Sequence, residues 1–315
     1  MKTHHLKTMM LSVLMCAAAS AAGCLGGTND TGAIRLGYLQ SDLHHLPAFI
    51  ALEKGFFEDE GLLVTVGGIF RAGPEQMSAF AAGELDVGYV GLAPAATAAL
   101  NGVVDITILA QVNKEGSALV CRPDITSLSQ LGGKTVAIPG HATMQDCLIQ
   151  KGLRNAGLTP EMLGLMVLKP PEMLPAMEAD DIDCFIAWEP YPAQAVNMGT
   201  GTVVARSGAL WKEHPCCVLI AQDRFTRIRP DETVKIIKAH QRACRFITDH
   251  PEEALSIAVH YTGMPRAIIK QAMKHMSYVP AIDRQKSRDF VEFLSDLHYL
   301  SPASRKKQLR FYTEN

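Results

Sequence analysis

Two adjacent histidines, His44 and His45, stand just before a predicted helix that starts at Pro47 and is closed by Gly55. An imidazole can ligate a metal, act as a general base, or form hydrogen bonds in the wall of a binding cleft. Proline suits the first turn of a helix and glycine suits the position after its end, so both histidines belong to the turn that enters the helix. Which chemistry they perform depends on the other turns near them.

A zinc site would require a third or fourth ligand beside the two histidines. The sequence offers His141 and residues 214–217 (HPCC). We expect Cys216 and Cys217 to lie in a strand, where successive side chains point to opposite faces. Both cysteines then cannot join one site, so the sequence predicts neither a bound metal nor a cofactor.

Covalent catalysis is not indicated either. The chain contains no G-x-S-x-G motif, and no serine stands in a convincing His/Asp context. We therefore expect one histidine of the pair to line a cleft as a neutral hydrogen-bonding group. The other then packs or faces solvent, and the plainer alternative is that both are ordinary loop residues.

The elements that position these turns follow from the pattern of apolar residues. From Ala33 onward, short apolar runs alternate with helical stretches, which is typical of βαβ units and a parallel, doubly wound α/β sheet. After Cys121 the same layout begins again, which predicts a second α/β lobe. The expected strands are 35–39, 62–68, 85–90, 105–112, 163–168 and 182–187, with a turn plus strand over 131–140, and the expected helices are 47–54, 75–82, 94–100, 143–156 and 171–179.

The second lobe is predicted to be an insertion into the first. One strand leaves the first half near Cys121, and residues 214–223 form a second strand on the way back. Two lobes joined by two crossing strands can hinge around a cleft. If the crossing strands lie side by side, Cys121 lies close to Cys216 or Cys217; otherwise these three are reduced packing residues. The expected organisation is a signal peptide (1–23), a lipidated tether (24–33), lobe I (34–117 and 218–315) and lobe II (118–217).

The first residues have the features of an export signal. Lys2 and Lys7 precede an apolar stretch, residues 9–22, and small residues then lead to Cys24. We expect the chain to be exported and Cys24 to be lipidated, with an uncleaved membrane anchor over residues 9–26 as the alternative. The 30 basic and 32 acidic residues form no basic cluster, so a nucleic-acid partner is not expected.

Several turns are placed to contact a ligand, because open parallel sheets bind ligands beyond the carboxyl ends of their strands. Trp188, at a predicted strand end, either stacks on a flat ligand or packs between lobes. The turns that lead into helices offer unpaired N–H groups to an anion. Acidic side chains at Asp42, Glu115 and Glu189 make the cleft less basic than a simple oxyanion site. A ligand with a donor or amine, as well as or instead of an anion, fits this balance.

Four stretches resemble the substrate-binding proteins of ABC importers of the nitrate, sulfonate and taurine type, a group that includes binders of thiamine pyrimidine precursors. The resemblance extends over residues 34–263. The stretches are HHLPAFIALEKGFFEDEGL (44–62), AGPEQMSAFAAGELDVGYVG (72–91), LGGKTVAIPGHAT (131–143) and DDIDCFIAWEPYPAQA (180–195).

This resemblance implies a bilobed periplasmic-binding-protein fold that closes on a small ligand and delivers it to an ABC permease. The protein would be a monomer without enzymatic activity, held outside the cytoplasmic membrane by its lipid anchor alone. His141 stands where anion-binding relatives commonly carry serine or a similar small polar residue, so nitrate or a simple sulfonate is in doubt. Carried over by position, the ligand contacts are Gln40, Asp42, His44, His45, Gly91, Leu92, Ala93, Asn113, Glu115, Ser117, Gly140, His141, Ala142, Thr143, Trp188 and Glu189.

Two alternatives stay open. One is an enzyme similar to the related pyrimidine synthases, which use a histidine and a lysine of their own chain; here the helix offers only Lys54, and we expect no cysteine-rich motif near the cleft. The other is a metal-responsive binding protein that uses His44, His45 and His214.

Overall fold

The structure is a computed structural model and describes residues 32–304 and 307–313. The chain divides into two units, residues 1–32 and 33–315, and the fold described below is that of the second unit. The predicted signal peptide and Cys24 lie outside the described residues. Within the described ranges, no helix is both long enough and apolar enough to cross a membrane.

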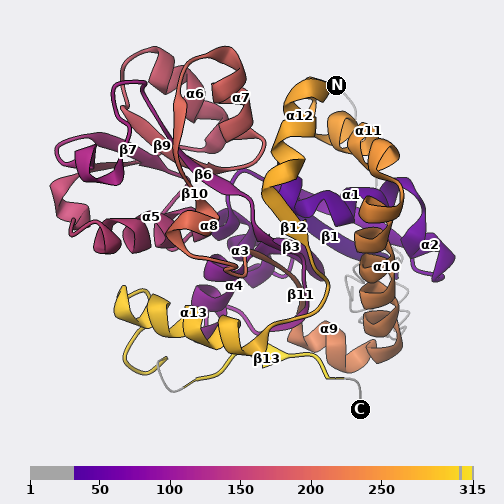
Figure 1. Cartoon of the computed structure of the whole chain (residues 1–315). Coiled ribbons are helices and arrows are strands. Elements are labelled where there is room, and N and C mark those ends of the chain that lie inside the picture. Colours follow the sequence, from indigo (N-terminus) through magenta and orange to yellow (C-terminus); the bar gives the residue numbers. More distant parts are fainter. Residues whose placement is uncertain (1–31, 305–306, 314–315) are drawn as a thin grey trace, which may run out of the picture. The chain divides into compact units, whose positions relative to one another are not determined.

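The first of two large sheets is a mixed one, with strand order β13-β4-β11-β3-β1-β2. Strands β1, β2 and β3 run parallel, whereas β11 is antiparallel to both β3 and β4. The chain returns to this sheet through β11 after building the second one (Figure 1). Its strands are β1 (Ile34–Leu39), β2 (Val64–Phe70), β3 (Val87–Gly91), β4 (Ile106–Gln111), β11 (Cys217–Gln222) and β13 (Arg310–Phe311).

The second sheet is built from one continuous stretch of chain and has strand order β10-β6-β9-β7-β8. Here β7 is parallel to β8 and β9, while β6 is antiparallel to β9 and β10. Its strands are β6 (Ser117–Cys121), β7 (Thr135–Ile138), β8 (Gly164–Val167), β9 (Cys184–Trp188) and β10 (Thr202–Arg206). A small antiparallel pair consists of β5 (Asn113–Glu115), which precedes β6 in the chain, and β12 (Met276–Tyr278).

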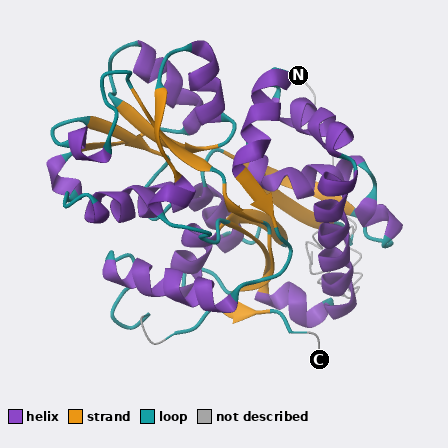
Figure 2. Ribbon diagram, viewed as in Figure 1, coloured by secondary structure: helices purple, strands orange, loops and turns teal. Residues whose placement is uncertain are grey.

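Helices cover both sheets (Figure 2). Helix α3 packs on β1 and β2, α4 on β3, and α5, α6 and α7 on β9. The helices are α1 (Leu46–Glu53), α2 (Phe56–Asp59), α3 (Gly73–Ala81), α4 (Leu92–Leu100), α5 (Met144–Asn155), α6 (Pro170–Glu178), α7 (Tyr191–Met198), α8 (Ser207–Leu210), α9 (Asp223–Ile228), α10 (Pro230–Asp249), α11 (Pro251–Thr262), α12 (Arg266–Ala272) and α13 (Arg284–Asp296).

The central strands of the second sheet, β6, β9 and β7, are buried on both faces, which explains why their sequences lack polar alternation. Successive residues of β9 point to opposite sides: Ile186 joins the core under α5, and Phe185 joins the core under α6 and α7. In β7, Val136 and Ala137 divide in the same way. Burial on both faces fixes the register, because a slip of one residue would exchange the two sets of side chains.

Two expectations about the connections between the sheets are wrong. The strands β6 and β11 do not pair with each other; they lie in different sheets. Cys121 is therefore not the neighbour of Cys216 or Cys217. Instead it faces Cys184 across the antiparallel β6–β9 pair and forms a disulfide with it. Cys147, in contrast, is a buried free thiol.

Candidate functional site

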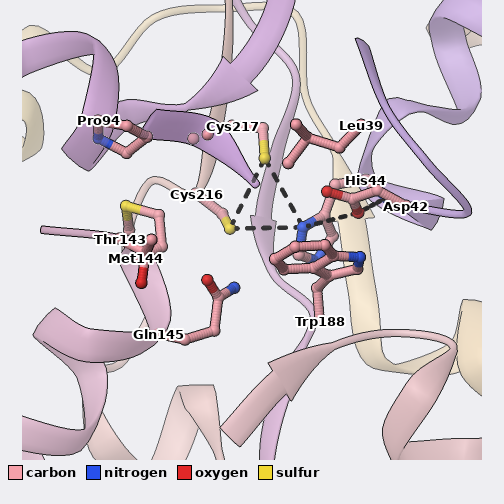
Figure 3. Close-up of a pocket in the computed structure, with 12 residues that line it drawn as sticks. Leu39, Asp42, His44, Pro94, Thr143, Met144, Gln145, Trp188, Cys216 and Cys217 are labelled. Atoms are coloured by element: carbon pink, nitrogen blue, oxygen red, sulfur yellow. Dashed lines mark hydrogen bonds and ion pairs between the residues drawn. The ribbon is translucent and has the colours of Figure 1, made fainter. Parts of the chain in front are cut away.

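A small cavity lies where elements of the two sheets meet, with a volume of about 20 Å³, room for one water molecule. The first sheet and its connections contribute the turn after β1, the starts of α3 and α4, and the start of β11. The second contributes the start of α5 and the end of β9. Figure 3 shows the side chains that surround it.

His44 is fixed in the cavity wall by bonds on both sides of its ring. It lies in a single 3-10 turn, η1 (Leu43–His45), whose first residue is preceded by Asp42 as the cap. The Asp42 Oδ1 accepts from the His44 backbone N at 2.9 Å and lies 3.3 Å from His44 Nδ1. On the far side, His44 Nε2 is 2.9 Å from the carbonyl oxygen of Gly116, to which it donates.

Glycine is required at position 116 for this contact. Gly116 has φ +91°, and a Cβ there would lie 2.3 Å from His44 Nε2. The ring can approach the backbone only because Gly116 has no side chain. The carbonyl oxygen is an acceptor only, so Nε2 carries a proton and Nδ1 is the atom turned into the cavity.

Both cysteines of the HPCC stretch point at His44. Cys216 Sγ lies 3.6 Å and Cys217 Sγ 3.7 Å from His44 Nδ1, and the two sulfurs are 4.0 Å apart (Figure 3). The prediction that the two side chains face opposite ways is wrong, because β11 begins only at Cys217. Cys216 lies before the strand, so the alternation of a strand does not apply to it.

Asn113 holds this cysteine turn in place. Its carbonyl oxygen accepts from the Cys216 backbone N, and its side-chain Oδ1 accepts from the Cys217 backbone N, both at 3.1 Å. The Cys216 carbonyl oxygen in turn accepts from the backbone N of Leu92 at the start of α4. Three segments around the cavity are thus joined by hydrogen bonds.

Cys216, His44 and Asp42 are buried side by side in this cavity and shift one another's pKa. The hydrogen bond from Cys217 and the nearby His44 outweigh burial and lower the pKa of Cys216 well below its usual value, while burial raises the pKa of Cys217. Burial alone lowers the pKa of His44, but the charges of Cys216 and Asp42 dominate and raise it to about 9. Burial raises the pKa of Asp42 to about 7.

The other two histidines of interest, His45 and His214, do not line the cavity, although His45 Nε2 lies 3.8 Å from Asp42 Oδ2. His45 Nδ1 accepts from the Leu39 backbone N at 3.0 Å, and burial lowers the pKa of His45 well below its usual value. His214 Nδ1 lies 3.2 Å from the Pro215 carbonyl oxygen. Among the described residues, the metal-ligating groups that converge are His44 with the two cysteines, and Asp42 with His45 and Cys217; His214 belongs to neither.

Five of the predicted contact residues line this cavity: Asp42, His44, Gly91, Thr143 and Trp188. Trp188 is 3% exposed, and its Nε1 has no hydrogen-bond partner among the described residues. A buried N–H without a partner is a donor that a ligand acceptor can satisfy. Sequence reasoning missed Leu39, Met144 and Gln145, left Gly73 and Pro94 out of the ligand contacts, and considered Cys216 and Cys217 only as metal ligands or as neighbours of Cys121. Only the adjacent cysteines carried a usable signal.

The helix starts that were expected to hold an anion are already engaged by protein groups. At α4, the backbone N of Ala93 donates to Met144 Sδ at 3.3 Å. At α5, the Asp146 carboxylate accepts from the backbone N of Ala142 at 2.8 Å, and the Thr143 side chain accepts from the Asp146 backbone N. The Asp146 carboxylate thus takes one N–H group before α5 that an anion could otherwise contact.

The remaining predicted residues lie away from the cavity wall. Gln40 is exposed. His141 and Ala142 line a second, more open cavity of about 210 Å³. Glu115 accepts from the Glu213 backbone N, and Glu189 accepts from the Ala193 backbone N and pairs with Arg206. Leu92, Asn113, Ser117 and Gly140 shape the backbone around the cavity without lining it.

Comparison with known proteins assigns the chain to a family. Residues 27–261 match the NMT1-like family, which is most of the chain. The chain belongs to the NMT1-like family. A Bacillus subtilis protein named as a putative aliphatic sulfonates-binding protein is 26% identical over 84% of this chain and 80% of its own length.

Solved structures of binding proteins share the fold of this NMT1-like chain. The periplasmic nitrate-binding protein of Synechocystis superposes with a TM-score of 0.78 at 18% identity, covering 87% of this chain and 84% of that one. The alkanesulfonate-binding protein of Xanthomonas axonopodis, bound to MOPS, gives 0.77 at 17% identity, covering 86% and 95%. The expected periplasmic-binding-protein fold is confirmed, and so is the resemblance to binding proteins of importers rather than to enzymes.

Proposed function

We propose that this protein is the extracytoplasmic solute-binding component of an ABC importer. It captures a small organic or oxyanion-bearing ligand between the two sheets, where the cavity of about 20 Å³ has to widen to admit it, and delivers the ligand to permease subunits. The observation that carries the proposal is that the cavity wall is shared: His44 and the cysteines come from the first sheet and its connections, and Thr143 and Trp188 come from the second. A ligand that touches both parts stabilises the closed arrangement, because it binds that state more tightly than an open one.

The location follows from the same proposal. The apolar stretch before Cys24 exports the chain, and lipidation of Cys24 keeps it at the outer side of the cytoplasmic membrane. Removal of residues 1–23 takes away Lys2 and Lys7, which leaves 28 basic and 32 acidic residues and a net charge of −4. The body of the protein then has no attraction to anionic lipid, so the lipid is the anchor. The binding unit acts as a monomer.

Mass spectrometry of the small molecules released from the purified full chain by mild denaturation tests the proposed function. The compound found is then titrated back into the emptied protein, together with nitrate, taurine and an alkanesulfonate as comparison ligands. We expect one compound to bind at one site per chain. A protein that releases no small molecule and binds none of the comparison ligands would contradict the proposal.

Trp188 and Trp211, the only tryptophans in the chain, provide a matched pair for the same titration. Trp188 lines the cavity, whereas Trp211 stacks on Phe290 outside it. Trp188→Ala removes aromatic contact with the ligand and weakens binding by about 1–3 kcal/mol. Trp211→Ala leaves the affinity unchanged. Equal affinities for Trp188→Ala and wild type would place the ligand elsewhere.

A further inference from the structure

We propose that His44, Cys216 and Cys217 form a metal site in this cavity, which takes a thiophilic divalent ion of the zinc class. The site is additional to the proposed capture of a small ligand and does not depend on it. Thiolate sulfur and imidazole nitrogen are the ligand set that such ions prefer. All three side chains line the same cavity, so the remaining coordination position opens onto it.

The spacing of the three atoms is that of a tetrahedral site. A four-coordinate zinc ion with Zn–S distances of about 2.3 Å and a Zn–N distance of about 2.0 Å holds its sulfurs about 3.8 Å apart and its nitrogen about 3.5 Å from each sulfur. In the structure the two sulfurs are 4.0 Å apart, and they lie 3.6 and 3.7 Å from His44 Nδ1. The side chains therefore need to move little to enclose the ion.

The histidine is oriented as metal-ligating histidines usually are. Its Nε2 donates to the Gly116 carbonyl oxygen, which leaves Nδ1 to face the sulfurs. A backbone carbonyl on the remote ring nitrogen fixes the tautomer and the ring plane of a ligating histidine. Asn113 fixes the two cysteines in a similar way, because it accepts hydrogen bonds from the backbone N–H groups of both Cys216 and Cys217.

The charges also suit a divalent ion. Two thiolates neutralise a 2+ ion, so a buried site of this composition carries no net charge, and a buried net charge is what proteins avoid. Asp42 Oδ1 lies 3.3 Å from His44 Nδ1, at the edge of the site. On binding, the ion displaces the protons of the ligating groups, which pass to solvent.

A second cysteine–histidine contact in the same chain offers a control. Cys244 Sγ lies 3.6 Å from His240 Nε2, also buried, but no second sulfur among the described residues joins it. His240 Nε2 is already bonded to the Gln111 carbonyl oxygen. One thiol and this imidazole are too few ligands to enclose an ion. Cys244→Ser therefore removes a buried thiol beside a histidine without touching the proposed site.

Cobalt(II) titration tests the proposal on the full chain, purified without an added histidine tag and kept in a non-thiol reductant. We expect one equivalent of Co²⁺ to bind, with thiolate-to-cobalt charge-transfer absorption and the intense visible bands of a four-coordinate ion, and Zn²⁺ to displace it. Cys216→Ser, Cys217→Ser and His44→Asn should each weaken binding at least about tenfold, a loss typical of disturbed metal sites, whereas Cys244→Ser should match wild type. Retention of the same bands and affinity in either cysteine variant would overturn the proposal.

X-ray absorption of the zinc-loaded wild-type protein keeps the test decisive if a variant fails to fold. Two sulfur scatterers with nitrogen or oxygen completing the shell are expected; a shell without sulfur would refute the site.

Calorimetry with anions on the metal-free protein separates this inference from the proposed function. Anion binding without stoichiometric cobalt binding refutes the metal site alone, and cobalt binding without any ligand binding supports the metal site while counting against ligand capture.

Discussion

Replacement of Gly116 by alanine is the perturbation whose effect the structure defines most closely. The backbone there has φ +91°, and the new Cβ would lie 2.3 Å from His44 Nε2 and 2.9 Å from the Cβ of Met276. The positive φ costs a residue with a side chain about 1–2 kcal/mol. Displacement of the imidazole breaks its bond to the Gly116 carbonyl oxygen, which costs about 0.5–1.5 kcal/mol more. We expect a total loss of about 2–3 kcal/mol in unfolding free energy.

Gly133→Ala is the control for this prediction. Gly133 has φ +75°, but apart from its two chain neighbours no residue lies within 4 Å of the position that the new methyl group would take, so this variant carries the backbone cost alone. Urea denaturation measures both free energies, and cobalt titration measures what happens at His44. We expect Gly116→Ala to be the less stable of the two and to lose cobalt affinity, while Gly133→Ala binds as wild type. Equal stability and equal cobalt affinity in the two variants would refute the account of how His44 is held.

Three further predictions concern other parts of the chain. Burial lowers the pKa of His240 from 6.5 to about 4, so its contribution to stability is present above pH 6.5 and is lost as the pH falls towards 4. Over that range the unfolding free energy of the wild type should fall by about 3 kcal/mol relative to that of His240→Gln. Unfolding free energies that follow the same pH dependence in both proteins would contradict this prediction. Replacing both Cys121 and Cys184 by serine opens a link that spans 63 residues and should cost about 4 kcal/mol in urea denaturation, whereas an unchanged midpoint would argue that the link is not formed. Cys24→Ala should move the protein from the membrane to the soluble fraction, and continued membrane retention would favour an uncleaved anchor.

The alternation of strands and helices was predictable because it depends on local patterns. The helix expected at 143–156 is α5 (Met144–Asn155), and the one expected at 47–54 is α1 (Leu46–Glu53). Proline at the start and glycine after the end placed the second of these within one residue. In contrast, β5, β12 and β13 are short and pair with distant segments, so no local pattern marks them.

The contents of the cavity were less predictable, because they depend on where a strand begins. If β11 began one residue earlier, Cys216 would follow the alternation of the strand. The start of β11 at Cys217 is held by a hydrogen bond to Asn113, more than a hundred positions earlier in the chain. The partner of Cys121 depends on strand register in the same way, since Cys184 is its opposite residue across β6 and β9. Long-range pairing of this kind leaves no mark in the spacing of cysteines.

The claim that the cavity beside Trp188 is the ligand site can be tested most directly by fluorescence. In Trp211→Phe, Trp188 is the only tryptophan left, so the emission reports on the cavity wall alone. The protein is titrated with the ligand that co-purifies with it, and the midpoint is compared with that from calorimetry on the same variant. The account predicts a saturable change in emission with the same midpoint in both measurements. Heat of binding without any change in Trp188 emission would contradict it.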